Sequence, residues 1–256
     1  MILRWAIILF FTLSLAASTS KVERDRLYIW SVGQGSWGTL ISVKYCLHFD
    51  MGGEFFVRHS ALNLCRQKLN VLYISHLDSD HISLIKPASR LFRELCLVNK
   101  ASLLRISREI IEAERMQKLS TGKSLNIFAQ RKYQAGLRKI DMIRGISDCD
   151  RAQIPKRARY IMFRTSPGFL KTTNDASEIY TLDKRWLFSG DSPKKAEKIW
   201  APLLGGQPTD TKKNISINSS KSKIEFLIVG HHGSPTSTSE ELIAALPNLK
   251  MAVVSA

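Results

Sequence analysis

Four side chains that can bind a metal ion lie within six residues of one another, at His76, Asp78, Asp80 and His81. They follow the apolar stretch 71–74, which is typical of a buried strand. Alternate residues of an extended segment point the same way, so the first three can converge on one pocket, and His81 reaches it from the next turn. Imidazole and carboxylate ligands together suit Zn²⁺ or Mn²⁺ better than Ca²⁺. The segment therefore predicts a site for one or two such ions.

Two further groups of polar residues follow predicted strands. Asp191 comes shortly after the apolar segment 186–188, and a carboxylate in that position can bridge two cations. His231 and His232 follow a second apolar segment, 224–229. Because adjacent side chains point in different directions, we expect one of these histidines to bind metal and the other to face substrate. Together with the first cluster, these groups predict one shared site.

The elements that position these residues are short strands and fewer helices. Apolar runs bounded by Gly, Asp and Ser favour strands, and an apolar stretch with a helical period favours a helix. We expect strands at 27–33, 39–43, 46–49, 71–74, 161–164, 178–182, 186–188, 224–229 and 251–255, and a helix at 240–246. Strands of this kind that open onto polar residues indicate a layered α/β fold.

The order of the motifs along the chain resembles the metallo-β-lactamase domain of ComEC-type proteins. The resemblance covers about residues 27–256, and the middle of the chain matches poorly. The matching segments are Val32-Gly33-Gln34-Gly35, Phe49-Asp50-Met51-Gly52, the segment from His76 to His81, Phe188-Ser189-Gly190-Asp191 and Val229-Gly230-His231-His232-Gly233-Ser234.

This resemblance implies a four-layer αββα metallo-β-lactamase sandwich with a one- or two-metal site at one edge. It also implies hydrolysis, often of phosphodiesters, and for ComEC itself a nuclease role in DNA uptake. Carried over residue by residue, it makes His76, Asp78, Asp80 and His81 the first metal motif, Asp191 the bridging carboxylate, His232 a ligand, His231 a group that stabilises substrate, Asp50 a residue that supports the site, and Asn174 and Ser177 the Asn-x-x-Ser segment.

Three departures from the family pattern bear on the metal site. Ser36 and Trp37 stand where the family commonly has Asp-Ala. No histidine occurs between positions 82 and 230, so the third histidine of many two-zinc members has no counterpart. The sequence also stops at Ala256, before a segment into which family members usually continue. The missing histidine puts full occupancy of a second metal position in question.

The segment 84–158 is rich in Lys, Arg, Leu and Ile, and we expect a basic helical insertion there, with helices at 107–119 and 130–143. It could face substrate, or it could be a solvated helix pair that packs on the core. Residues 1–20 have the charged start, short apolar run and small residues of a signal peptide, with an uncleaved anchor or a buried helix as the alternatives. The rest, 21–256, is then one domain in the periplasm or outside the cell.

The four cysteines form no C-x-x-C pair, so they suggest no zinc site, whereas export makes disulfides possible. The pairing is open. No second long apolar run follows residue 20, so we expect no transmembrane channel in this chain.

The chain has a formal net charge of +16, which favours an anionic substrate such as DNA or another phosphodiester polymer. A generally cationic surface is the alternative. We expect a metal-dependent hydrolase, a phosphodiesterase or nuclease, in which Asp80 orients a metal-activated water or accepts its proton. The alternatives are a phosphoesterase that acts on cell-envelope polymers and a binding protein that has lost activity.

Overall fold

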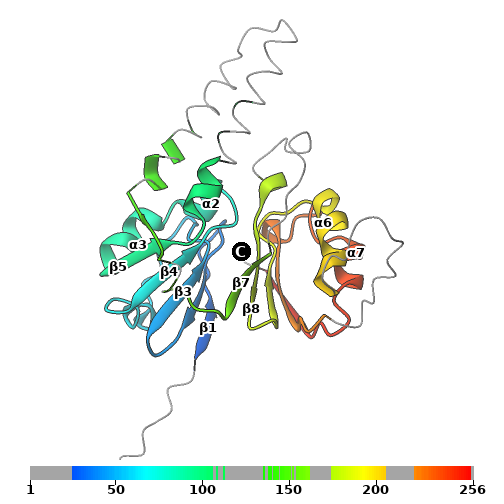
Figure 1. The fold of residues 1–256 in the computed structure, drawn as a ribbon, viewed down its shortest axis with the longest axis horizontal. Helices are drawn as coiled ribbons and strands as arrows, with labels where there is room; N and C mark the ends of the chain where they lie inside the picture. Colours follow the sequence, from blue (N-terminus) through cyan, green and yellow to red (C-terminus); the bar gives the residue numbers. More distant parts are fainter. Residues whose placement is uncertain are drawn as a thin grey trace, which may run out of the picture.

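The computed structural model describes residues 25–105, 145–150, 154–161, 174–205 and 222–254, with the single positions 108, 112, 135, 138, 139, 141–143 and 152. Its strands form two mixed sheets, of six and five strands, and a few short helices accompany them. The α/β class expected from the sequence is therefore confirmed. In Figure 1 the two sheets face each other, and α3 lies outside the first sheet while α6 and α7 lie outside the second.

The first sheet has the order β1-β2-β3-β4-β5-β6. The strands β1, β2 and β3 are antiparallel, and β3 to β6 run parallel. Parallel strands with both faces covered are near-continuous apolar runs, as in β4. The bounds are β1 Arg26–Ile29, β2 Gly38–Ile41, β3 Tyr45–Phe49, β4 Leu69–Tyr73, β5 Glu94–Leu97 and β6 Ser147–Asp148.

The second sheet has the order β11-β10-β9-β8-β7. Here β7, β8 and β9 are antiparallel, whereas β9, β10 and β11 are parallel. The parallel part brings the ends of β9 and β10 to the same edge of the sheet. The bounds are β7 Ala158–Ile161, β8 Ile179–Leu182, β9 Trp186–Phe188, β10 Phe226–Val229 and β11 Met251–Val254.

Within the described residues the helices are short. Ser239 caps α7 by accepting a hydrogen bond from Leu242 N, and His59 caps α1 in the same way through Ala61 N. The helices are α1 Ser60–Asn63, α2 Ser79–Ile82, α3 Ile85–Leu91, α6 Lys194–Trp200 and α7 Glu240–Ala244, and the 3-10 helices are η2 Asn174–Ala176, η3 Ala201–Gly205 and η5 His231–Gly233. No helix in the described part of the chain is long and apolar enough to cross a bilayer.

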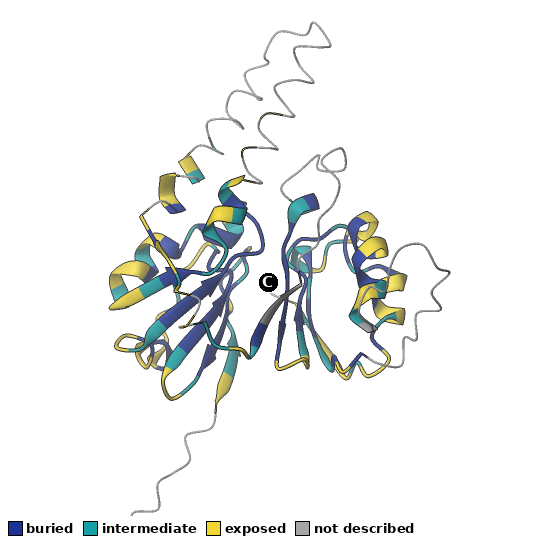
Figure 2. Ribbon diagram, in the orientation of Figure 1, coloured by how far each residue is buried: buried dark blue, intermediate teal, exposed yellow. Residues whose placement is uncertain are grey.

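One hydrophobic cluster lies between the sheets. It joins Phe49 and Tyr73 of the first sheet to Tyr180, Phe188 and Ile228 of the second. The rings of Phe49 and Phe188 stack nearly parallel, with centroids 4.0 Å apart and an interplanar angle of 10°. Figure 2 shows buried residues along the strands and exposed ones on the outer sides of the helices. The inner faces of the two sheets therefore share a core.

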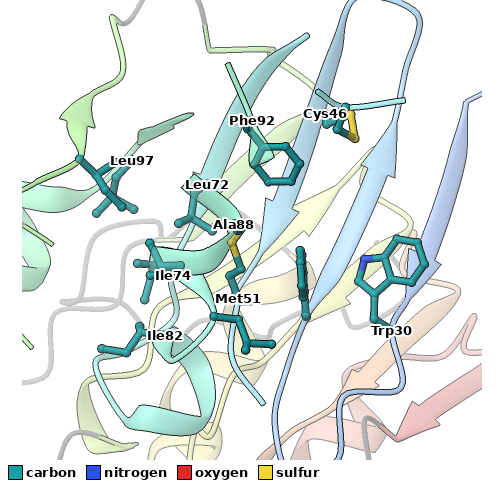
Figure 3. Packing of buried hydrophobic residues seen from close by; sticks show 14 of the residues in the cluster. Trp30, Cys46, Met51, Leu72, Ile74, Ile82, Ala88, Phe92 and Leu97 are labelled. Atoms are coloured by element: carbon teal, nitrogen blue, oxygen red, sulfur yellow. A yellow bond between two sulfur atoms is a disulfide. The ribbon is translucent and has the colours of Figure 1, made fainter. Parts of the chain in front are cut away.

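A second cluster packs α2 and α3 against the outer face of the first sheet. Figure 3 shows Met51, Leu72, Ile74, Ile82 and Phe92 in this packing. Burial of each such side chain contributes about 2 kcal/mol. The helix α2, which carries Asp80 and His81, is therefore held by apolar contacts with this cluster.

Two disulfides tie the first sheet together, and they account for all four cysteines. Cys46 of β3 is bonded to Cys65, and Cys96 of β5 is bonded to Cys149 beyond β6. The second bond closes the longer loop, with a sequence separation of 53 residues. The chain-entropy account gives it about 4 kcal/mol of stabilisation. The pairing left open by the sequence is thus settled for these residues.

The segment 84–158 differs from the expected helical insertion. Its first residues form α3 and β5, its later residues form β6, and β5 and β6 extend the first sheet. The segment therefore contains two strands that the sequence does not reveal, because short elements without a long apolar period are hidden in a basic segment. Residues 100–105, 138–139 and 141–143 are helical, and most of the two predicted helices, 107–119 and 130–143, lies outside the described residues. The predicted signal peptide, 1–20, lies outside them as well.

A buried polar network supports the first sheet on its outer face. His48 of β3 is fully buried, and its Nδ1 accepts a hydrogen bond of 3.3 Å from Trp37 Nε1. Its Nε2 lies 3.0 Å from the side-chain oxygen of Asn70, so the neutral tautomer with hydrogen on Nε2 satisfies both contacts. Burial lowers the pKa of His48 to about 4, although the hydrogen bond to Asn70 acts in the opposite direction.

We expect this histidine to make the metal-free protein sensitive to acid. Between pH 6.5 and 4 the unfolded chain binds a proton at position 48 and the folded chain does not, so stability falls as the pH falls. The full loss is about 3 kcal/mol. Urea unfolding over this pH range, in the presence of a chelator, measures it. A His48→Gln variant should lose that part of the pH dependence, and an identical slope in both proteins would contradict the assignment.

Candidate metal site

The predicted ligands meet at one edge of the two sheets. His76 follows β4, and α2 then carries Asp80 and His81. Asp191 follows β9, and His232 follows β10 in η5. These strands belong to the parallel parts of two different sheets, and α/β proteins commonly hold ligands at the carboxyl ends of such strands.

Four of the predicted residues form a close cluster. Ligand atoms of Asp80, His81, Asp191 and His232 all lie within 4.8 Å of one another, and we call these residues the four-ligand cluster. His81 Nε2 is 3.0 Å from Asp191 Oδ1, and His232 Nε2 is 3.3 Å from Asp80 Oδ2. Two imidazoles and two carboxylates at such separations could hold a metal ion.

His81 is oriented by a carboxylate on the side away from the cluster. Its Nδ1 lies 2.8 Å from Asp50 Oδ2, which fixes the ring and turns Nε2 toward Asp191. Nε2 is buried and, despite the 3.0 Å separation, is not in line for a hydrogen bond with that carboxylate. A buried nitrogen without a hydrogen-bond partner fits a metal ligand. Asp50, expected to support the site, thus contacts a predicted ligand.

Ser75 joins Asp50 to the two histidines of the first motif. Its backbone N–H donates to Asp50 Oδ1 at 2.7 Å, and its hydroxyl donates to Oδ2 of the same carboxylate at 2.9 Å. The hydroxyl oxygen also lies 3.0 Å from His76 Nδ1 and 3.2 Å from His81 Nδ1. His76 Nε2 is buried and has no hydrogen-bond partner among the described residues. Both histidines therefore turn Nε2 toward the site.

The charges of the site favour ionised carboxylates. Burial raises the pKa of Asp191, but the contact with His81 and the nearby His76 and His231 outweigh burial and lower it to about 2. The hydrogen bond with His232 lowers the pKa of Asp80. Asp191 thus keeps its charge over the physiological pH range, as a metal ligand requires.

The same charges raise the pKa of His81. Burial acts to lower its pKa, but the carboxylates of Asp50 and Asp191 on its two sides raise it well above the usual value. Without a metal ion, the two carboxylates therefore favour the protonated form of the ring. A metal ion at Nε2 takes the position of that proton, so metal binding at this site is coupled to proton release.

Three of the six described non-glycine residues with positive φ lie at the site. Asp50, His231 and His232 have positive φ values of 53°, 47° and 50°. Residues other than glycine rarely adopt this backbone conformation, which costs about 1 kcal/mol at each residue. Such strain persists where the surroundings determine the conformation, and here it directs three side chains of one site.

The two adjacent histidines have different surroundings. His232 joins the four-ligand cluster, whereas His231 lies outside it and its side chain is 37% exposed. His231 Nδ1 is 2.8 Å from Thr236 Oγ1, and its Nε2 is 3.9 Å from Asp191 Oδ2. The exposed ring therefore stands beside the cluster, where it could contact a bound substrate.

The loop that carries these histidines is anchored from α6. Glu197 is fully buried, and its carboxylate accepts hydrogen bonds from the backbone N–H groups of Thr238 and Ser239. The Ser237 hydroxyl donates to Gly230 O at 2.7 Å, which closes the turn around His231 and His232. Glu197 was not expected from the sequence, because its partners lie about forty positions away.

The remaining predicted residues lie at the border of the site. Asp78 is not in the four-ligand cluster, and its Oδ2 lies 3.6 Å from His76 Nε2. Its Oδ1 accepts a hydrogen bond of 3.1 Å from Lys139 Nζ. Asn174 and Ser177 bound a short turn, in which Ser177 N donates to Asn174 O. The next residue, Glu178, donates its N–H to Ser75 O and so ties this turn to the site.

Sequence reasoning missed Ser75 and Lys139. Ser75 directly precedes His76, and a hydroxyl between a strand and a metal motif is a usable signal for a supporting role. Nothing in the sequence marks Lys139 among the many basic residues around it, because its contact with Asp78 spans 61 positions.

Comparisons with known proteins do not assign the chain to a family. No protein-family model matches the chain. No curated protein matches it either. The description of the site therefore rests on its own geometry: an Asp/His cluster at the carboxyl ends of parallel strands that could hold a metal ion.

Proposed function

We propose that the chain is a metal-dependent phosphodiesterase or nuclease with the αββα fold of the metallo-β-lactamase superfamily. The observation that carries the proposal is the four-ligand cluster, in which His81 Nε2 is buried without a hydrogen-bond partner. The order of the sequence motifs supports the same reading, and so do two facing sheets with helices on their outer sides. Zn²⁺ or Mn²⁺ suits this mixture of imidazole and carboxylate.

A bound ion of this kind lowers the pKa of a water molecule toward neutrality and so supplies hydroxide for hydrolysis. Around it, Asp50 and Ser75 hold His81 in place through hydrogen bonds. Asp80, whose carboxylate is partly exposed, can accept a proton from the attacking water. The exposed His231 ring can donate a hydrogen bond to an oxygen on which negative charge develops.

The charge of the chain supports an anionic substrate such as DNA or another phosphodiester polymer. A net charge of +16 raises the local concentration of polyanions. The signal-peptide pattern and the two disulfides support an exported protein, because disulfides persist in oxidising compartments. Polymers of the cell envelope are therefore also within reach of the enzyme.

Hydrolysis of bis-p-nitrophenyl phosphate tests this proposal. We expect turnover with Zn²⁺ or Mn²⁺ that a chelator abolishes. An Asp80→Ala/His232→Ala variant should lose at least about 100-fold in kcat/KM, because two ligands are removed. Asp148→Ala, at an exposed position on β6, is the matched control and should retain full activity. Metal binding without turnover on any phosphodiester would instead support a binding protein that has lost activity.

A further inference from the structure

A small pocket adjoins the four-ligand cluster and includes part of it. Asp191, His231 and His232 line this pocket, together with apolar side chains from the ends of β9 and β10. Ser36, from the loop between β1 and β2, lines it as well. A group that approaches the cluster through the pocket therefore lies beside Ser36.

A free hydroxyl group in this lining belongs to Ser36. The other polar residues of the lining form hydrogen bonds through their side chains, and they are Asp50, His81, Asp191, His231 and His232. The Ser36 hydroxyl forms no hydrogen bond with a described residue, although Ser36 is half-buried. A hydroxyl group can donate one hydrogen bond and accept others. That of Ser36 is thus available to a molecule that enters the pocket.

The backbone of Ser36 is fixed to the segments that carry the site. Ser36 N donates to Asp80 O at 3.0 Å, and Ser36 O accepts from Gly52 N at 3.0 Å. A Cβ atom at Gly35 would lie 2.2 Å from Gly53 Cα, an approach that only glycine permits. The close packing of these segments holds Ser36 beside Asp80. A donor that is held in place before the reaction stabilises developing charge without the cost of reorganisation.

The charges of the pocket give a neutral donor a particular value. The carboxylates of the cluster attract a metal ion, but they repel the oxygens of an anionic substrate. When the two imidazoles of the cluster bind the ion, His231 and Ser36 remain as side-chain donors in the lining. The serine hydroxyl does not ionise in the physiological pH range, so its hydrogen bond does not depend on pH as that of His231 does.

We propose that the Ser36 hydroxyl donates a hydrogen bond to a non-bridging oxygen of a phosphodiester bound at the cluster. The inference rests on the proposed function and adds to it a residue that contacts the substrate. Because the hydroxyl is neutral, it supplies a donor and leaves the attraction between the carboxylates and the ion unchanged. A carboxylate at position 36 would attract the ion and repel the substrate. The effects of that change on metal binding and on anion binding therefore have opposite signs.

Three variants at position 36 test the inference. Calorimetric titration measures the affinity of the full chain for Zn²⁺, and then the affinity of the stoichiometrically loaded chain for inorganic phosphate. Ser36→Ala should bind Zn²⁺ normally and lose about 10-fold or more in phosphate affinity and in kcat/KM on bis-p-nitrophenyl phosphate, because a hydrogen bond to a charged group is lost. Ser36→Asp should bind Zn²⁺ at least as tightly as the wild type and lose about 100-fold or more in phosphate affinity. Ser36→Thr, which keeps the hydroxyl, should behave like the wild type.

The outcomes separate a substrate contact from damage to the fold. Ser31→Ala and Ser31→Asp are the matched controls, at an exposed serine of the same loop, and they should leave all of these quantities unchanged. Equal phosphate affinity in the wild type and Ser36→Ala, or a parallel loss of Zn²⁺ and phosphate affinity in Ser36→Asp, would overturn the role of Ser36 and leave the proposed hydrolase standing. A wild type that binds no Zn²⁺ and hydrolyses no phosphodiester would contradict the proposed function, and this inference with it.

Discussion

Replacement of Asp191 by asparagine is expected to abolish metal binding while leaving the chain folded. Asp191 is 3% exposed and contacts His81 at 3.0 Å, and its pKa of about 2 keeps it charged. Asparagine has nearly the same volume, and its side-chain oxygen can still accept the hydrogen bond of 3.1 Å from His231 N. The amide lacks the negative charge that a divalent ion requires, so the binding site is lost and the packing is not.

Mutation of residues that hydrogen-bond to a metal ligand lowers metal affinity by up to about 100-fold. Because Asp191 is itself a proposed ligand, we expect the affinity for Zn²⁺ to fall by at least that factor. Hydrolysis should fall by about 1000-fold or more. Calorimetric titration measures the affinity, and Asp148→Asn on β6 is the control for the change of charge. An Asp191→Asn protein that binds Zn²⁺ as tightly as the wild type would show that the ion lies elsewhere.

Replacement of Gly52 by alanine should disrupt the loop that carries the metal ligands. A methyl group there would lie 2.1 Å from Asp80 O and 2.4 Å from His81 N, which are backbone atoms and cannot turn away. Met51 N also donates to His81 O at 2.8 Å, so the two segments are bonded as well as packed. The methyl group must therefore push α2 away from β3 and displace both ligands.

Overpacking of this kind costs about 3 kcal/mol or more. We expect urea unfolding to show that loss and the metal content of the folded fraction to fall with it. Gly145→Ala is the matched control, because its nearest neighbour is the Met142 carbonyl oxygen at 3.9 Å. Equal stability and equal metal content in the two variants would contradict the close packing of this loop on α2.

The meeting of the four ligands could be predicted because each motif directly follows an apolar strand. The segments at 71–74, 186–188 and 224–229 were recognised from their runs of large apolar residues, and β4, β9 and β10 lie at these places. Parallel strands carry their carboxyl ends to one edge, so the polar residues after them meet. The prediction that one of His231 and His232 binds metal and the other faces substrate follows from their being adjacent, and their side chains are 37% and 19% exposed.

The elements that the sequence did not reveal are short. The helix α6 has only seven residues, and no side chain caps its start, whereas Ser239 caps α7. The strand β5, at 94–97, has four residues with a charged first position, and it was hidden in a basic segment. Strand β7 includes residues 158–160, which the sequence did not mark as strand, and positions 162–164 of the expected strand 161–164 lie outside the described residues.

Long-range pairings were also beyond the sequence. Cys96 and Cys149 are 53 positions apart and meet only because β5 and β6 are neighbours in the sheet. Lys139 donates a hydrogen bond to Asp78, which lies 61 positions earlier in the chain. Both depend on packing between segments far apart in the chain, which local patterns do not describe.

The metal content of the purified protein tests the central claim most directly. Elemental mass spectrometry of the chain, purified without added metal or chelator and compared with Asp191→Asn, counts the ions that the four-ligand cluster holds. The account predicts about one equivalent of zinc or manganese in the wild type and almost none in the variant. A wild type without metal, which also fails to take up Zn²⁺ or Mn²⁺ when these are supplied, would contradict it.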